Sequence, residues 1–234
     1  FIVGFVLRKR IFFISILILI ASLNLNAVNL SLGFTSQFAI SGTTTNSSKI
    51  FPANFRDFDV GFNFSIGINQ PISYSMSFSI LADLGYYHDS YGLKYNIEGK
   101  RAIEEYQFDS FLIGGYGRFN FGFLSLGAGG GVKIPVSASY KIDKPSLYRS
   151  YMLTFGDLND IFEKVFISYL RFSIDFSIFN YFLIGVYVNY DFPIHFQDNN
   201  YMSDILINKS SISSLDIGIQ FGYYINLNID KNYY

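Results

Sequence analysis

The sequence has 234 residues, of which half are hydrophobic and a fifth aromatic, with 27 Phe, 19 Tyr, no Trp and no Cys. Charged residues make up 15%, below the roughly 25% that is usual in soluble domains, and the formal net charge is −1. The lack of Cys excludes disulfides and Cys-ligated metal sites, and the lack of a basic excess argues against a nucleic-acid partner.

The first 27 residues have the layout of a secretory signal peptide. A basic stretch at residues 8–10 precedes an apolar run at residues 11–20 and a small-residue exit at Ala27, which is the order found in such signals. We expect cleavage after Ala27, giving a signal peptide at 1–27 and a single barrel domain at 28–234. An uncleaved anchor helix is the alternative, disfavoured because the apolar run is short for a membrane span. Without the signal, the chain has fourteen Lys and Arg and eighteen Asp and Glu, which gives a formal net charge of −4.

After residue 27, eight segments alternate large apolar side chains with small or polar ones. This period of two is typical of extended strands with two different faces. In chain order the expected strands are residues 28–41, 57–69, 72–87, 106–119, 123–137, 166–178, 182–192 and 216–227. In the fourth segment the apolar phase changes between Phe108 and Phe111, from which we infer a bulge near Asp109 and Ser110.

The connections between these segments alternate in length. Residues 69–71, 120–122 and 179–181 are expected to form tight turns. The other connections are long and polar: residues 42–56, 88–105, 138–165 and 193–213. In the third long connection Leu158, Ile161, Phe162 and Val165 fall at helical spacing, which predicts a helical turn there.

The last segment carries a second pattern besides its alternation. It has a polar residue, a glycine two positions later and hydrophobic residues three and five positions after the glycine: Gln220, Gly222, Ile225 and Leu227. This pattern resembles the C-terminal signal of bacterial outer-membrane barrels. The resemblance implies recognition of these four residues by the barrel-assembly machinery.

The volume of the apolar faces decides which side of the sheet is outside. These faces carry roughly 45 large side chains, whereas the interior of an eight-stranded barrel is just wide enough to be filled by side chains. Exposing so many to water would create an apolar patch far larger than soluble monomers tolerate. The apolar face is therefore expected to meet lipid, with closure of the barrel removing unpaired strand edges from the bilayer.

Taken together, the segments resemble the small eight-stranded outer-membrane proteins of the OmpX, opacity-protein and OmpA transmembrane-domain type. The resemblance covers residues 28–227. It implies an all-β fold, an eight-stranded antiparallel up-and-down transmembrane β-barrel in contact with outer-membrane lipids. Function in such barrels is carried by loops on a rigid scaffold. A host or matrix ligand is therefore expected to bind through the four long connections.

Charged residues on the polar faces form the best candidate site. The expected lumen charge network consists of Asp57, Asp59, Asp83, Arg118, Lys133, Arg171, Asp175, Asp191 and Asp216. The five acidic residues other than Asp175 are expected toward the long-loop ends of their strands, with Arg118 and Asp175 nearer the tight turns. Because a charge inside a narrow barrel must be paired or hydrated, we favour an internal network that plugs the lumen. The alternative is an acidic mouth that favours cations entering a narrow pore.

Two further motifs suggest chemistry but have simpler interpretations. The glycine-rich stretch 127–133 looks like a phosphate-binding loop, which needs a helix N-terminus. Strand alternation instead continues through it, and its glycines are expected to make room for Tyr116. His88, Asp89 and Ser90, just beyond the third segment, contain the groups of a catalytic dyad, but three adjacent loop residues point in different directions.

The sequence therefore predicts an integral outer-membrane barrel with a largely plugged polar lumen and a structural or surface-interaction role. A narrow cation-preferring channel is the alternative, and a lipid-modifying enzyme using His88 is the third interpretation. No catalytic residue, no cofactor and no metal site is expected, since His88 and His195 lack any ligand spacing.

Overall fold

The computed structural model describes residues 28–46, 51–52, 57–97, 100–144, 147–179, 181–197 and 211–227. The expected signal peptide lies outside these residues, as do parts of the long connections. In the described part of the chain no helix is both long and apolar enough to cross a membrane.

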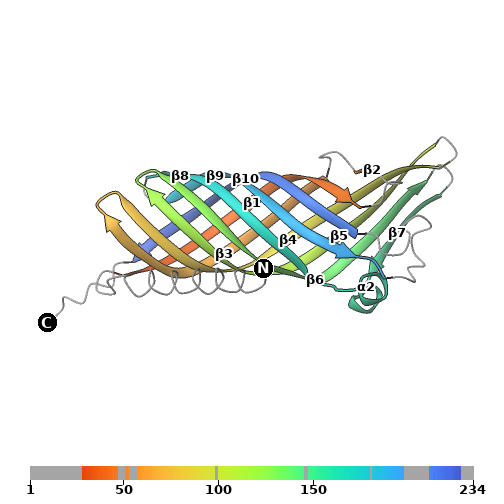
Figure 1. Ribbon diagram of the computed structural model, residues 1–234, viewed down its shortest axis with the longest axis horizontal. Helices are drawn as coiled ribbons and strands as arrows, with labels where there is room; N and C mark the ends of the chain where they lie inside the picture. The colour runs from red at the N-terminus through yellow and green to blue at the C-terminus, as the bar shows by residue number, and fades with distance from the viewer. Residues whose placement is uncertain are drawn as a thin grey trace, which may run out of the picture.

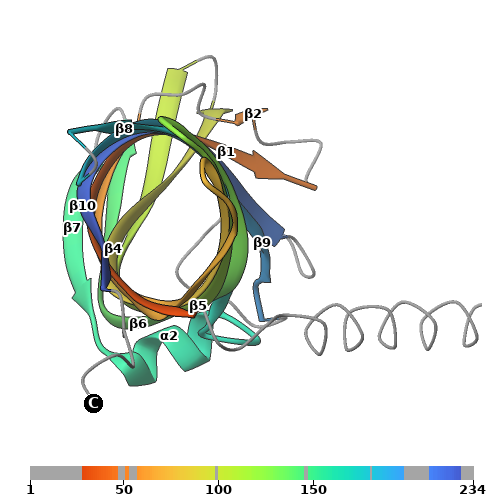
Figure 2. The same cartoon turned by 90° about the vertical axis from the view of Figure 1, so that its left-hand side faces the viewer.

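Eight antiparallel strands close into a barrel, as Figures 1 and 2 show from the side and from one end. The barrel strands are β1 (Asn29–Thr45), β3 (Asp57–Ser73), β4 (Met76–Ile97), β5 (Lys100–Phe121), β6 (Leu124–Lys144), β8 (Ile167–Ile178), β9 (Phe182–His195) and β10 (Ser211–Leu227). Each strand pairs with the next one along the chain, and β1 pairs with β10 to close the ring. Two further strands, β2 (Phe51–Pro52) and β7 (Leu147–Leu153), add to β4 and β6 outside the ring. The predicted all-β, eight-stranded antiparallel barrel is confirmed.

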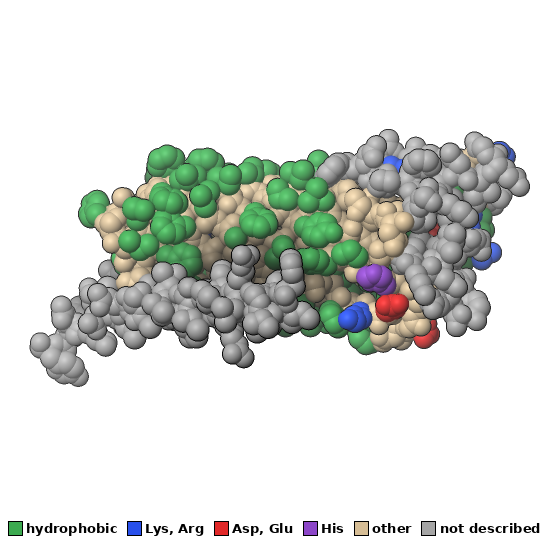
Figure 3. Space-filling view, viewed as in Figure 1, with side chains coloured by type: hydrophobic (Ala, Val, Ile, Leu, Met, Phe, Trp, Pro, Cys, Tyr) green, Lys and Arg blue, Asp and Glu red, His purple; other side chains and the backbone are tan. Residues whose placement is uncertain are grey.

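The outer wall of the barrel is a belt of exposed apolar side chains. Phe62, Leu84, Phe172 and Ile219, from four different strands, are 47–58% exposed. In Figure 3 such side chains cover the barrel wall, whereas the visible charged and histidine side chains lie toward the end that carries α2 and β7. Exposed apolar surface of this extent is stable only against hydrocarbon, so the belt marks the membrane-spanning part of the barrel.

The strands continue well beyond the belt at the long-loop end. β4 and β5 remain paired up to Ile97 and Lys100, and β6 continues to Lys144 with β7 returning along it. The expectation of polar loops at 88–105 and 138–165 is therefore wrong for most of these residues. They form two projecting hairpins (Figure 1), because backbone pairing continues after the lipid-facing alternation has ended.

The expected bulge exists, but it belongs to the neighbouring strand. The register between β5 and β6 shifts at residues 109–110, and Val136 of β6 is the extra residue. β5 itself pairs with β4 without any shift. The apolar phase changes within β5 because Phe108 faces the interior whereas Phe111 faces outward.

The interior beyond the belt contains a hydrophobic core, which we call the apolar cap. Its members are Tyr91, Leu93, Tyr106, Phe108, Ala138, Tyr140, Ile142, Leu153, Leu158, Ile161, Phe162, Ile167, Ile194, Phe196 and Ile212. The helix α2 (Phe155–Ile161) begins after the N-cap Thr154 and buries Leu158 and Ile161 in this core, which confirms the predicted helical turn. Because water surrounds the chain here, apolar side chains pack inward rather than outward.

Candidate functional site: the charged lumen

Lys133 of β6 is the centre of an acidic layer just below the apolar cap. Its ammonium nitrogen Nζ lies 2.5 Å from Asp89 Oδ1 and 2.9 Å from Asp191 Oδ2, and all three side chains are at most 1% exposed. The ammonium also faces the ring of Tyr87 at 4.1 Å. A buried lysine held by two carboxylates and an aromatic face is stable only with such partners.

Two further carboxylates complete this layer. Asp216 accepts hydrogen bonds from Ser214, Asn189 and Tyr87 at 2.8, 2.8 and 3.3 Å. Asp59 Oδ1 accepts from the backbone N–H of Ser90 at 2.9 Å. We define the acidic layer as Asp59, Asp89, Lys133, Asp191 and Asp216. It contains four carboxylates and one ammonium group.

A second layer lies deeper in the barrel and is formally neutral. It contains Arg118, Arg171, Asp83 and Asp175, which together line a void of about 20 Å³. Asp83 accepts from Ser65 at 2.6 Å, and Asp175 accepts from Ser173 at 2.8 Å and Gln220 at 2.5 Å. Side-chain hydroxyl and amide groups therefore solvate these two carboxylates.

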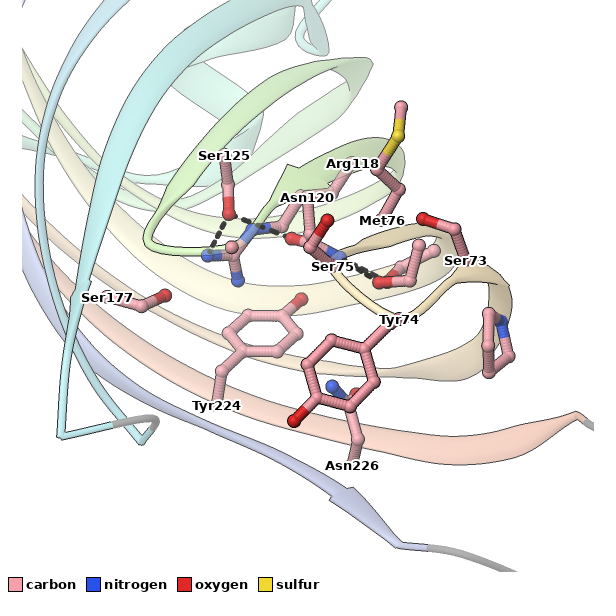
Figure 4. Close-up of a pocket in the computed structure, with 14 residues that line it drawn as sticks. Ser73, Tyr74, Ser75, Met76, Arg118, Asn120, Ser125, Ser177, Tyr224 and Asn226 are labelled. Carbon is pink, nitrogen blue, oxygen red and sulfur yellow. Dashed lines mark hydrogen bonds between the residues drawn. The ribbon is translucent and has the colours of Figure 1, made fainter.

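At the turn end the lumen opens into a cavity of about 360 Å³. Arg118 and Tyr224 border it, with the guanidinium carbon 4.3 Å from the centre of the Tyr224 ring. Figure 4 shows Arg118 reaching Ser125, with Nη2 donating to the hydroxyl at 3.0 Å, and Ser125 in turn reaching Asn120. From this end, the cavity leads to the neutral layer, the acidic layer and the apolar cap in turn.

The residues expected to form one lumen network lie in two separate layers of the structure. Asp59, Lys133, Asp191 and Asp216 meet in the acidic layer, whereas Arg118, Arg171 and Asp175 belong to the neutral layer. Asp83 was expected near the long-loop ends, but it lies in the neutral layer with Arg171. Asp57 was expected in the network as well. Its Oδ2 instead accepts from the backbone N–H of Gly92 at 3.0 Å, which places it at the rim beside the β4–β5 hairpin.

Asp89 is the lumen residue that the sequence analysis missed, because the third segment was ended at Tyr87. β4 continues, and the inward positions follow one another at odd numbers through Tyr87, Asp89 and Tyr91. Its neighbour His88 faces outward, where Nδ1 lies 2.8 Å from Asp109 Oδ1. The adjacent residues therefore do diverge, and His88 has its acidic partner across the hairpin.

Two other expectations concern positions on the barrel wall. A Cβ atom on Gly127 would overlap the hydroxyl of Tyr116, so this glycine does make room for that ring. Of the terminal assembly signal, Gln220 and Gly222 face the lumen, whereas Ile225 and Leu227 are exposed on the apolar belt. Their recognition by the assembly machinery stays a prediction.

Among the described residues, one group of carboxylates has spacing that suits a metal ion: Asp59, Asp89 and Asp216. Neither histidine belongs to it, and His195 lies at the end of β9, where its carbonyl accepts from the N–H of Glu163 at 2.9 Å. The acidic layer, rather than the two histidines, is the candidate site of this structure.

No protein-family model and no curated protein matches the chain. Solved structures that it resembles are outer-membrane proteins. Ail, the attachment invasion locus protein of Yersinia pestis, is 12% identical with a TM-score of 0.37, over 86% of this chain and 99% of Ail. Neisserial surface protein A is 8% identical with a TM-score of 0.37, over 81% and 95% of the two chains. The protease OmpT from Escherichia coli is 11% identical with a TM-score of 0.34, over 86% and 95%. These similarities concern the strand arrangement alone.

Proposed function

We propose that the chain is an integral outer-membrane protein without an open pore, whose hairpins present a rigid surface to a host or matrix ligand. Outer-membrane lipids surround its apolar belt, and the barrel-assembly machinery inserts it through the terminal signal at Gln220 to Leu227. Export by the signal peptide at 1–27 is part of this proposal.

The apolar cap is the observation that carries the proposal. It fills the long-loop end of the barrel with buried aromatic side chains, such as Tyr106, Phe108 and Phe162, at 2% exposure or less. The ring centres of Tyr106 and Phe162 lie 5.7 Å apart, as expected for packed aromatic side chains. A packed core at this end disfavours ion flow and gives the projecting hairpins a fixed position.

The outer face of β7 has the composition of an interaction surface. Tyr148 and Met152 are 71% and 77% exposed, and they share one face of the strand with Ser150 between them. On the neighbouring strand Lys141 lies 4.0 Å from Glu105. Tyr and Met are enriched in protein interfaces, and the pairing of β7 with β6 holds these side chains in register.

Binding of cells to immobilised matrix components tests the surface role. Cells that carry the protein should bind above cells without it, and the double variant Tyr148→Ala/Met152→Ala should lose most of that difference. Tyr74→Ala, an exposed tyrosine in the tight turn at the opposite end, is the matched control and should bind normally. Equal binding by both variants, or no binding by the wild type, contradicts the surface proposal.

Planar-bilayer recordings test the closed lumen independently. The reconstituted protein should show no large stable conductance, because a packed cap and two hydrogen-bonded layers separate the two ends of the lumen. A reproducible, cation-selective conductance would instead establish the alternative, a narrow channel with an acidic mouth.

One observation favours the third function, a lipid-modifying enzyme. His88 and Asp109 form an outward-facing histidine–carboxylate pair at the upper edge of the belt, the arrangement that orients a general base. Tyr86 also donates to Asp109. If cells that produce the protein show modified lipid A, His88→Ala should abolish the modification; unmodified lipid A in producing cells would exclude this function.

A further inference from the structure

The acidic layer contains three carboxylates that converge on one point. Asp59 comes from β3, Asp89 from β4 and Asp216 from β10, and each supplies an oxygen within 4.8 Å of the others. All three residues are at most 1% exposed. Carboxylates this close and this well buried repel one another unless positive charge lies between them.

The protein supplies too little positive charge to this layer. Four carboxylates face the single ammonium of Lys133, which is already in contact with Asp89 and Asp191. In the described part of the chain, neither Asp59 nor Asp216 has a lysine, arginine or histidine nitrogen within 4.0 Å. Three negative charges therefore remain uncompensated when all four carboxylates are ionised.

Three buried oxygen atoms in this layer or next to it also have no hydrogen-bond donor. They are Oδ2 of Asp59, Oδ2 of Asp89 and the amide oxygen Oδ1 of Asn189. Buried polar atoms without protein partners are uncommon, and a set of such acceptors beside four carboxylates points to a cation-binding site.

Asn189 provides evidence for a cation site that does not depend on the carboxylates themselves. It is fully buried, and its amide nitrogen donates to Asp216 Oδ2 at 2.8 Å and to Asp191 Oδ1 at 3.0 Å. These two bonds hold the amide against the carboxylates, with its oxygen unpartnered beside them. A neutral amide oxygen added to carboxylate oxygens is a ligand set that hard divalent cations prefer.

We propose that Asp59, Asp89 and Asp216 bind one divalent cation inside the barrel, with Asn189 as a neighbouring neutral oxygen ligand. Ca²⁺ fits this ligand set, because it binds carboxylate and amide oxygens in a flexible geometry at about 2.4 Å, so that two of its ligand atoms lie up to about 4.8 Å apart. The all-oxygen ligand set disfavours zinc, which prefers nitrogen and sulfur ligands.

The position of the site predicts how the ion enters and what it does. The apolar cap closes the lumen above it, and the neutral layer with Tyr87 and Tyr187 lies below. The ion is therefore taken up as the barrel closes, and it exchanges slowly afterwards. It joins β10 to the paired strands β3 and β4 across β1, which lies between β3 and β10, so it stabilises the closed barrel beneath the hairpins.

Terbium luminescence tests the proposal, with Tb³⁺ as the probe for Ca²⁺. Tyr87 donates to Asp216 at 3.3 Å and Tyr91 to Asp191 at 2.8 Å, so tyrosine excitation is transferred efficiently to an ion held here. Protein purified from membranes is unfolded in urea and refolded in micelles with Tb³⁺. Emission should saturate at one ion per chain, and Ca²⁺ present during refolding should suppress it.

Isosteric variants give the control. Asp59→Asn and Asp216→Asn should each weaken Tb³⁺ binding by roughly tenfold or more, since loss of an outer-shell partner alone costs 10–100-fold in known metal sites. Asp83→Asn removes a carboxylate of the neutral layer that is also buried, at 4% exposure, and should leave binding unchanged. Metal content of the untreated wild-type protein, measured by native mass spectrometry, checks the site without any variant and should show bound Ca²⁺.

Two outcomes overturn the proposal. The first is folded wild-type protein that shows neither terbium emission above the Asp216→Asn background nor bound Ca²⁺, which would mean that protons neutralise the carboxylates. The second is binding that survives in Asp59→Asn and Asp216→Asn but is lost in Asp83→Asn, which would place the ion in the neutral layer. Both readouts are independent of ligand binding and conductance, so they do not depend on the proposed function.

Discussion

Replacement of Lys133 by methionine is the sharpest test of how the lumen is held together. Methionine keeps the length and the unbranched shape of the side chain, so little cavity is created. What is lost is one ammonium that lies 2.5 Å from Asp89 and 2.9 Å from Asp191 with no exposed surface. Removing one partner of a buried ion pair costs about 3–5 kcal/mol, because the other charge stays buried without compensation. This corresponds to about two to four orders of magnitude in the folding equilibrium constant.

Lys141 supplies a matched control on the same strand. It lies 4.0 Å from Glu105, and the two side chains are 35% and 26% exposed. Exposed pairs contribute about 0.2–1 kcal/mol, so Lys141→Met should change stability little. Both variants are compared with the wild type by urea unfolding in micelles, followed by circular dichroism, in the presence of a chelator.

The comparison has a clear refuting result. If Lys133→Met loses no more stability than Lys141→Met, at an unchanged dependence of the unfolding free energy on urea, the ammonium is not what holds the acidic layer. Adding Ca²⁺ during refolding should reduce the loss in Lys133→Met, because the proposed cation takes over part of the missing positive charge.

Three further changes test other parts of the fold. Phe64→Lys, in the middle of the lipid-facing belt, should destabilise the barrel by about 2–4 kcal/mol in urea unfolding, and Phe58→Lys near the boundary by about 0–1 kcal/mol. Gly131→Ala should cost about 1–3 kcal/mol in the same assay, since its Cβ would lie 2.1 Å from a backbone oxygen of β5. Hydrogen bonds from the side chain and backbone of Thr154 lower the pKa of Asp157 below 3.8. The cap of α2 should therefore be intact above pH 3.8 and be lost only as the pH falls through that lowered value, which a carbon chemical-shift titration of the carboxyl group measures.

The strands were predictable wherever one face meets lipid and the other meets the polar lumen. In β3 and β10 this contrast keeps a strict period of two over the whole belt, as in the run from Phe58 to Ile68. Above the belt the contrast is inverted, because water replaces lipid outside and the cap occupies the inside. The alternation expected of a lipid-facing strand therefore does not continue through residues 88–105 and 138–165. For this reason the paired strands there were predicted as loops.

The change of apolar phase in β5 is real, but the bulge inferred from it was assigned to the wrong strand. Phe108 and Phe111 lie on opposite faces, which suggested an inserted residue in that strand. Each is apolar for a different reason: Phe108 packs in the cap and Phe111 faces lipid. The inserted residue, Val136, is on the partner strand, and no single-strand pattern can show which of two paired strands contains a bulge.

The candidate site was predictable in composition but not in grouping. Alternation alone places Asp59, Lys133, Asp191 and Asp216 inside, and continuing it two residues past Tyr87 would have added Asp89. It does not show the depth at which each side chain meets the others, because that depends on how the strands are staggered around the barrel. Asp83 was therefore predicted near the long-loop ends rather than in the neutral layer. The charge imbalance of the acidic layer could not be predicted for the same reason.

The two ends of the barrel have different surroundings, lipid around the belt and water around the hairpins. The acidic layer lies at the boundary between them. Below it, lipid outside favours a polar interior in which Arg118 and Arg171 balance Asp83 and Asp175. Above it, water outside favours an apolar interior that offers few hydrogen bonds to a carboxylate, such as the one from the Tyr91 hydroxyl to Asp191. The residues that make up the apolar cap supply no positive charge to this boundary, and Lys133 alone does not balance four carboxylates. The proposed cation at this level would complete the balance without an open lumen, so the proposed ion site and the proposed closed lumen are physically compatible.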